Sequence, residues 1–216
     1  MKNKKTLIIV TFIGLIVGFF FATSIYKREQ EKDDSKRSIK YSEVFIRSHS
    51  PSKGPDKAPV FLVEFMDPEC ESCRAFHPMV KKVMAQYPNK VRLILRYTPF
   101  HKNSKFMIKI LEASRRQHKF WESLDLVFKT QHLWGSHKNP RPELIWKYLP
   151  NVSGLNIEQI KKDIKDPSID KLIQQDIDDG KRLNVRQTPT FFVNGKRLKR
   201  LGYEILKRVI EHELKL

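Results

Sequence analysis

Residues 63–78 read VEFMDPECESCRAFHP and contain the only two cysteines of the chain, Cys70 and Cys73. The stretch that leads to them, VFLVEF at 60–65, is short, β-branched and almost wholly apolar, which predicts a strand buried on both faces. After the first cysteine, apolar side chains recur at intervals of three and four, a spacing typical of a helix. We therefore expect a strand that ends just before the cysteine pair and a helix over about 70–87.

The rest of the sequence predicts a layered α/β domain. VRLILRY at 91–97 predicts a second strand, and the helix that connects the two strands makes them parallel. Helical spacing then dominates 100–184, which predicts a helical insertion. Two short strand patterns over 190–198 flank Asn194-Gly195, the strongest two-residue signal for a tight hairpin. Apolar spacing over 203–214 predicts a closing helix, so the order of elements favours the α/β class.

The N-terminal residues differ in composition from the domain that follows. Residues 6–26 (TLIIVTFIGLIVGFFFATSIY) carry no charge and are long enough to cross a hydrocarbon core as a helix. We expect a membrane anchor over 1–26, with a cleaved signal peptide as the alternative, for which ATS at 22–24 is a weak cleavage site. Residues 27–58 are polar and charged, which predicts a tether. The folded domain is then expected over 59–216.

The chain is strongly basic, with 42 Lys and Arg against 24 Asp and Glu and a formal net charge of +18. This balance favours anionic partners without choosing among them. The run GKRLKR at 195–200 is interpreted as a solvated face, and we expect no nucleic-acid partner. A membrane-tethered domain gains attraction to anionic headgroups from the same charges.

The cysteine pair has several candidate uses, because C-x-x-C serves zinc sites, haem attachment, structural bridges and redox chemistry. Zinc takes four ligands, and no second cysteine pair or close histidine pair completes the set. Haem attachment needs a histidine at position 74, which is Arg74. A structural disulfide across so short a loop constrains the unfolded chain little. Redox chemistry is favoured, since a sulfur at a helix N-terminus is stabilised as a thiolate.

Helix geometry assigns the two roles. Cys73 follows Cys70 by three residues, which places it about one turn deeper on the same helix face and more protected. We therefore predict that Cys70 is the nucleophile, that Cys73 is the resolving thiol, and that the two form a disulfide in the oxidised protein.

The motifs VEFMDPECESC at 63–73 and TPTFFVNGK at 188–196 make the chain resemble the thioredoxin-like superfamily, and the long helical insertion resembles its DsbA branch. The resemblance covers about 58–214. It implies a buried acid on the strand before the cysteines, a proline in the active-site helix, and a cis proline that faces the sulfurs. Glu64, Pro78 and Thr188-Pro189 stand at these positions.

Two of these residues have a physical interpretation as well. Burial of Glu64 would raise its pKa and make it a candidate to relay the proton of Cys73, and an edge residue that faces water is the alternative. Pro189 would be an ordinary trans proline on base rates, whereas a cis bond would leave Thr188 positioned to pair with a substrate backbone. Strong oxidants of the family carry Pro and His between the cysteines. Here an acid, Glu71, follows Cys70, which predicts a weaker oxidant.

Together these features predict a membrane-anchored thiol:disulfide oxidoreductase with one membrane pass and its catalytic domain on the periplasmic or extracytoplasmic side of the cytoplasmic membrane. The expected partners are protein thiols or disulfides and a membrane redox partner that recycles the cysteine pair, with no cofactor and no metal. The sequence does not choose among oxidase, isomerase and reductase. The alternative function is a metallochaperone that holds Cu(I) with the two thiolates, near Met66 and Met79.

Overall fold

The computed structural model describes residues 23–24, 43–136 and 138–216. The chain divides into two compact units, Met1–Glu43 and Val44–Leu216. Apart from the described residues 23–24, the predicted anchor over 1–26 lies outside the described residues, as does the first half of the predicted tether. None of the described helices combines the length and the apolar character needed to cross a membrane. The domain from Val44 onward contains the predicted site.

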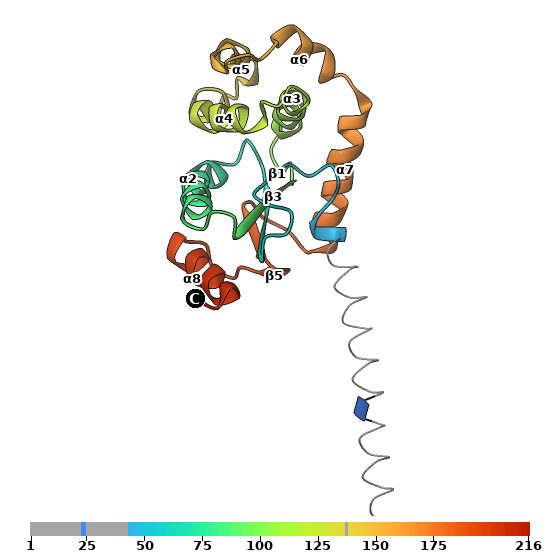
Figure 1. Ribbon diagram of the computed structural model, residues 1–216. Coiled ribbons are helices and arrows are strands. Elements are labelled where there is room, and N and C mark those ends of the chain that lie inside the picture. Colours follow the sequence, from blue (N-terminus) through green and yellow to red (C-terminus); the bar gives the residue numbers. More distant parts are fainter. Residues whose placement is uncertain (1–22, 25–42, 137) are drawn as a thin grey trace, which may run out of the picture. The chain divides into compact units, whose positions relative to one another are not determined.

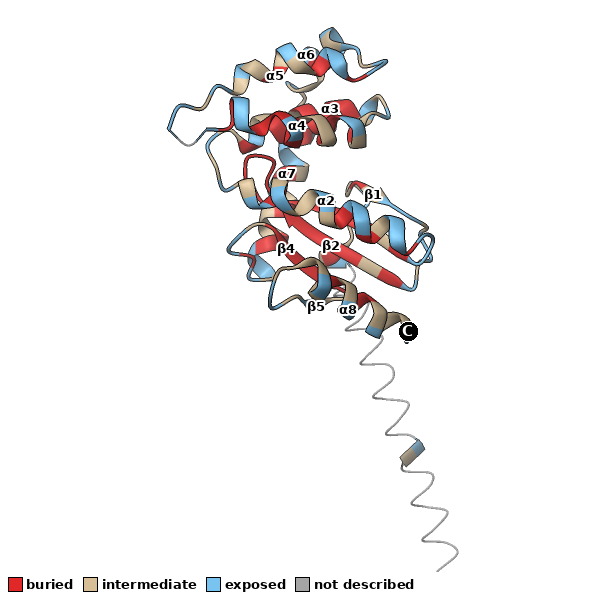
Figure 2. Cartoon of the chain, turned by 90° about the vertical axis from the view of Figure 1, so that its left-hand side faces the viewer, coloured by how far each residue is buried: buried red, intermediate tan, exposed pale blue. Residues whose placement is uncertain are grey.

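A five-stranded mixed sheet lies at the centre of this domain, in the order β1-β3-β2-β4-β5 (Figure 2). The strands are β1 (Ser52–Lys53), β2 (Val60–Met66), β3 (Val91–Tyr97), β4 (Thr190–Val193) and β5 (Lys196–Arg197). As predicted, β2 and β3 pair in parallel, with Val60 opposite Val91. The predicted hairpin also forms, because Asn194 and Gly195 adopt the positive φ values of 46° and 78° that a tight turn between antiparallel strands requires.

The helices follow the predicted order. They are α2 (Glu71–Gln86), α3 (Ser104–Arg116), α4 (Phe120–Trp134), α5 (Ile145–Tyr148), α6 (Ile157–Asp163), α7 (Pro167–Arg182) and α8 (Tyr203–Leu214), with short 3₁₀ turns at Pro142–Leu144 and Leu149–Asn151. The predicted helical insertion corresponds to α3 through α7. Local signals fix several ends: the Asn156 side chain accepts a hydrogen bond from Gln159 N at the start of α6, and Asn184 is left-handed just after α7.

Strand β2 is buried on both faces, as its apolar run predicts. Because successive side chains alternate between faces, Leu62 and Met66 join the larger core cluster, which also contains the two cysteines. Val63 and Phe65 join a smaller cluster on the opposite face with Ile94 and Phe192. Glu64 has the parity of Leu62 and Met66, so the central strand directs its carboxyl group to the face that holds the cysteines.

The predicted tether extends too far toward the domain, because residues 44–58 belong to the folded unit. Phe45 is only 2% exposed and packs at 5.0 Å from the ring of Phe192. Strand β1 pairs antiparallel with β3, with Ser52 opposite Ile94. The composition of this segment is polar, but one aromatic anchor and an added edge strand offset the cost of ordering it.

A buried charge cluster also holds this segment. Arg96 of β3 is fully buried and its guanidinium nitrogens lie 2.8 Å from Asp176 Oδ1 and 2.7 Å from Asp179 Oδ2 of α7. The N-terminal segment adds two partners, since Arg47 Nε lies 2.8 Å from Asp179 Oδ2 and His49 Nε2 lies 2.7 Å from Asp176 Oδ1. A buried carboxylate needs such partners to stay ionised, which is why polar residues order here.

Candidate active site

The two cysteines lie where β2 passes into α2. Cys70 is the N-cap residue of α2 and is 8% exposed, whereas Cys73 in the first turn is fully buried. Both are free thiols in this structure. Their relative exposure agrees with an attacking Cys70 and a protected Cys73.

The loop between β2 and Cys70 is held by a buried carboxylate. Asp67 Oδ1 accepts a hydrogen bond from Glu69 N at 2.9 Å, and Asp67 Oδ2 accepts one from Phe100 N at 2.8 Å. The backbone N–H of Cys70 donates to Asp67 O at 3.1 Å. These bonds set the turn that presents Cys70 and join it to the segment after β3.

The environment of Cys70 favours its thiolate. The pKa of Cys70 is lowered to about 5. The largest cause is a hydrogen bond from the Cys73 thiol, and burial acts in the opposite direction and raises the pKa. The Thr188 side chain and the backbone N–H groups of Cys73 and Ser72 lower it further. The predicted contribution of the helix N-terminus is therefore present as two backbone donors. At neutral pH Cys70 is anionic.

Cys73 has the opposite preference. Burial raises its pKa well above 9.0, and the hydrogen bond to Cys70 and the charges of Glu64 and Cys70 raise it further. The backbone N–H of Asp67 lies 3.5 Å from Cys73 Sγ and has a smaller effect in the other direction. The reduced pair thus keeps its one proton on Cys73.

Glu64 lies in the central strand, opposite Leu95 of β3 and Phe191 of β4, and is 3% exposed. The alternative of an edge residue facing water is therefore wrong. Burial raises the pKa of Glu64 to about 8, with a further contribution from the charge of Cys70. A carboxyl group with this pKa is largely protonated at neutral pH, on the same face as the buried thiol.

Thr188 and Pro189 lie beside the nucleophile. The Thr188-Pro189 peptide bond is cis, as the family resemblance implies. In the thiol form Cys70 Sγ donates to the Thr188 carbonyl oxygen at 3.3 Å. The structure therefore brings Cys70, Cys73, Glu64, Thr188 and Pro189 into one site.

The sequence interpretation missed Gln131, which contacts this site from the helical insertion. Gln131 Nε2 donates to the carbonyl oxygens of Pro68 at 2.8 Å and Cys70 at 3.0 Å. Its side chain is 1% exposed, and Oε1 has no hydrogen-bond partner among the described residues. The residue belongs to α4, and no local pattern marks a glutamine on a buried helix face as a neighbour of a loop 61 residues earlier.

The segment after β3 was also missed as part of the site. Asn103 N and Nδ2 donate to the two carboxylate oxygens of Glu69 at 2.7 and 2.8 Å. His101 Nδ1 lies 2.8 Å from Asp67 Oδ2. Burial lowers the pKa of His101, but the hydrogen bond to Asp67 and the charges of Asp67, Cys70 and Glu69 outweigh it and raise the pKa overall. These contacts place an exposed aromatic residue, Phe100, on the segment bonded to the cysteine loop.

His77 of α2 contacts the helical insertion. Its Nε2 lies 2.6 Å from Asp125 Oδ1 of α4, and its ring packs 4.9 Å from that of Phe128. The pair ties α2 to the helical insertion. Among the described residues, no group of three or more His, Cys, Asp or Glu side chains is arranged to hold a metal ion.

Comparison with known proteins assigns the class. A family model described as Thioredoxin matches residues 47–212, so the chain belongs to the thioredoxin family. It is 28% identical over 221 residues to the probable disulfide bond formation protein D of Bacillus cereus, across the full length of both chains. Among the curated relatives are also Na(+)/H(+) antiporters such as NhaA of Herminiimonas arsenicoxydans, of which the chain spans only 22%.

Solved structures agree with this class. The crystal structure of oxidised BdbD from Bacillus subtilis has a TM-score of 0.70 at 26% identity, covering 78% of this chain and 94% of that one. Wolbachia pipientis alpha-DsbA1 has a TM-score of 0.70 at 19% identity, covering 81% and 96%, which shows the shared fold. The resemblance to the DsbA branch of the thioredoxin-like superfamily is confirmed.

Proposed function

We propose that this protein is a thiol:disulfide oxidoreductase that exchanges disulfides with protein substrates through Cys70 and Cys73. One observation carries the proposal: the pKa of Cys70 is lowered to about 5 while that of Cys73 is raised. A structural disulfide needs no such difference between its two thiols, whereas exchange needs one thiolate that attacks and a second thiol that waits.

The steps follow from this asymmetry. In the reducing direction the Cys70 thiolate attacks a substrate disulfide, a Cys70–substrate bond forms, and the displaced substrate sulfur leaves as a thiolate. Cys73 then loses its proton and attacks Cys70 Sγ, which releases the second substrate sulfur and leaves the Cys70–Cys73 disulfide. The oxidising direction is the reverse, and Cys73 regains its proton when it leaves.

Glu64 is suited to hold that proton. Cys73 is buried, so water reaches it poorly, and Glu64 is a nearby group whose pKa of about 8 allows both states near neutral pH. Thr188 and Pro189 are suited to bind the substrate, because the Thr188 backbone lies beside Cys70 Sγ, where the mixed disulfide forms. An extended substrate segment would pair with that backbone.

The proposal includes the location of the domain. The uncharged run at 6–26 supports a single-pass anchor in the cytoplasmic membrane, with residues 27–43 as a shortened tether and the catalytic domain on the extracytoplasmic side. A membrane redox partner would recycle the cysteine pair there. The weaker-oxidant prediction, based on Glu71 beside Cys70, belongs to the same proposal.

The experiment is an equilibrium of the reduced and oxidised protein against glutathione, combined with an insulin-reduction assay. We expect exchange activity that is lost in Cys70→Ser, and a stable mixed disulfide with substrate in Cys73→Ala. Ser72→Ala is the matched control, because it changes the same loop and leaves both thiols. Undiminished exchange in Cys70→Ser would refute the proposal. The comparisons give no support to the Cu(I) metallochaperone, and a copper titration of the reduced protein tests it directly.

A further inference from the structure

A basic groove lies between α8 and the segment that follows β5, and none of the active-site residues lines it. The groove has a volume of about 480 Å³. Three partly exposed apolar side chains, Leu198, Ile205 and Val209, line it together with exposed cationic residues from both elements. The combination of an apolar surface with a surrounding ring of positive charge distinguishes this groove from an ordinary solvated face.

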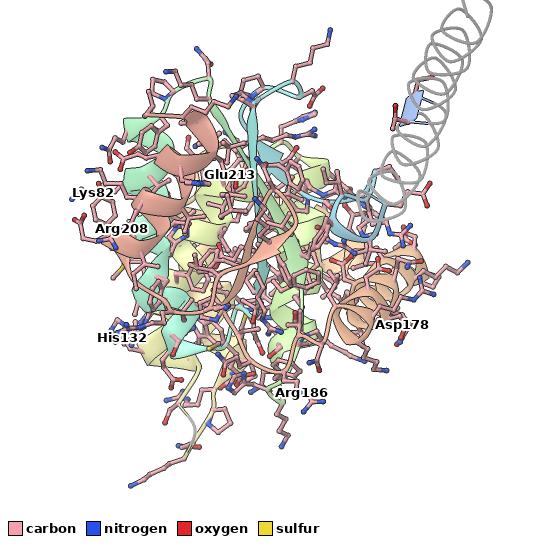
Figure 3. All side chains as sticks on the ribbon, turned by 90° about the horizontal axis from the view of Figure 1, so that it is seen from below. Lys82, His132, Asp178, Arg186, Arg208 and Glu213 are labelled. Atoms are coloured by element: carbon pink, nitrogen blue, oxygen red, sulfur yellow. The ribbon has the colours of Figure 1, made fainter. Side chains whose placement is uncertain are left out.

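The positive charge in the groove is largely uncompensated. Lys199, Arg200 and Arg208 are exposed and form no ion pair within the described part of the chain. The acid among the described lining residues is Glu213, which is already bound to Lys196 Nζ at 2.9 Å. Figure 3 shows Arg208 and Glu213 projecting from α8.

Some of the cations elsewhere on the described surface have an acidic partner. Lys81 lies 2.6 Å from Asp125, Lys109 lies 2.8 Å from Asp170, and Arg116 lies 2.6 Å from Asp166. Of the residues that line the groove, five are Lys or Arg and one is Glu, so positive charge is in local excess there. A local excess of cations beside exposed apolar side chains is a feature that an anionic, amphipathic partner would match.

We propose that this groove docks onto the anionic headgroups of a lipid bilayer. Cations contact phosphate or glycerol-phosphate headgroups while Leu198, Ile205 and Val209 reach the boundary of the acyl chains. Single-stranded nucleic acid is a poorer match, because it uses aromatic side chains for stacking and no Phe, Tyr or Trp lines the groove.

The inference rests on the membrane anchor of the proposed function, which keeps the groove near the bilayer. The tether over 27–43 is 17 residues long. A fully extended chain spans at most about 3.3–3.6 Å per residue, so the start of the domain stays within about 60 Å of the membrane surface. A short tether gives an effective concentration on the order of millimolar, at which even weak headgroup contacts are occupied.

The test uses the full chain reconstituted in vesicles of phosphatidylcholine alone or with phosphatidylglycerol. A neutral acetylating reagent is applied, and the labelling rate of Lys196 in the groove is compared with that of Lys147, an exposed lysine on α5. We expect anionic vesicles to protect Lys196 relative to Lys147, and high salt to remove the protection.

A pair of matched variants separates docking from net charge. The groove variant Lys199→Gln/Arg200→Gln/Arg208→Gln removes three positive charges and is expected to lose the protection. A loss of about five-fold per cation predicts roughly a hundred-fold weaker docking equilibrium. The control variant Lys162→Gln/Lys165→Gln/Lys171→Gln removes the same charge from exposed positions on and between α6 and α7, and is expected to keep the protection. Helix α6 lies at the opposite end of the domain from α8 (Figure 1).

Equal protection on neutral vesicles, or protection that survives in the groove variant, would overturn the inference. Stronger protection of Lys196 by an added oligonucleotide or by polyglutamate than by anionic lipid would assign the groove to another partner and overturn it as well. An alkaline carbonate wash tests the anchor separately. If the wash strips the chain, the anchor fails, and lipid-dependent protection is then measured with the chain added to preformed vesicles.

Discussion

Replacing Glu64 by Gln tests the electrostatics of the site, because the burial of this carboxyl group has a calculable cost. Its pKa is raised from 4.5 to about 8 in the folded protein. Between these two values the unfolded chain has lost the proton and the folded chain still holds it. Folding stability therefore declines as pH rises through this window, by up to about 1.4 kcal/mol per pH unit.

The magnitude follows from the two pKa values. From pH 5 to pH 7 the decline attributable to Glu64 is about 2.5 kcal/mol as an upper limit. Glu64→Gln has no such titration, so the difference in unfolding free energy between the variant and the parent should grow by that amount over the two pH units. The carboxyl group is 3% exposed, so solvent screening reduces the figure little.

The assay is urea unfolding of residues 44–216 at pH 5, 6 and 7. A Cys70→Ala/Cys73→Ala background removes the thiol titrations, and it also removes the smaller contribution of the Cys70 charge. Glu204→Gln, at an exposed position on α8, controls for the amide substitution itself. A difference between Glu64→Gln and its parent that stays constant across this range would refute the burial argument and with it the role of Glu64 as a proton relay.

Three further predictions concern the nucleophile, its loop and the buried charge cluster. The rate of alkylation of Cys70 should be half-maximal near pH 5. Cys73→Ala should move this midpoint to higher pH, because the hydrogen bond from the Cys73 thiol lowers the pKa of Cys70 most. An unchanged midpoint would contradict this role of Cys73. Gln131→Leu should lower the unfolding free energy by about 1–3 kcal/mol and slow disulfide exchange, since two buried carbonyl oxygens lose their donor. The control is Leu133→Ala, at an exposed position on the same helix. An effect no larger than that of the control would exclude a positioning role for Gln131. Arg96→Met should lower the unfolding free energy, measured in urea at neutral pH, by about 3–5 kcal/mol, because it leaves two buried aspartates with fewer cations. A smaller loss than that caused by Arg47→Met, which changes the more exposed arginine, would show that Arg96 is not the centre of the cluster.

The elements predicted well are those whose signals are local. The apolar run before Cys70, the apolar stretch in 91–97 and the Asn194-Gly195 pair each decide their structure within a few residues, and the strand, helix, strand order then fixes the parallel pairing. The lower exposure of Cys73 relative to Cys70 was also predictable, because helix geometry places the second thiol one turn deeper.

The elements that were missed depend on contacts between distant parts of the chain. Gln131 contacts the cysteine loop only because α4 packs against α2, and no pattern near residue 131 shows that. The polar composition of 44–58 is typical of a tether, but part of its order comes from ion pairs with Asp176 and Asp179, more than 120 residues later. Contacts between residues so far apart in the chain leave no signal in a short stretch of sequence.

The attachment of the N-terminal segment has a mechanical consequence. Residues 44–53 are fixed to the domain through Arg47 and His49 on α7 and through β1 on the outer edge of β3. A pulling force applied to the chain before residue 44 would therefore act first on these two ion pairs and on the pairing of β1 with β3. In the sheet order β1-β3-β2, strand β3 lies between this attachment and the strand that leads to the cysteines.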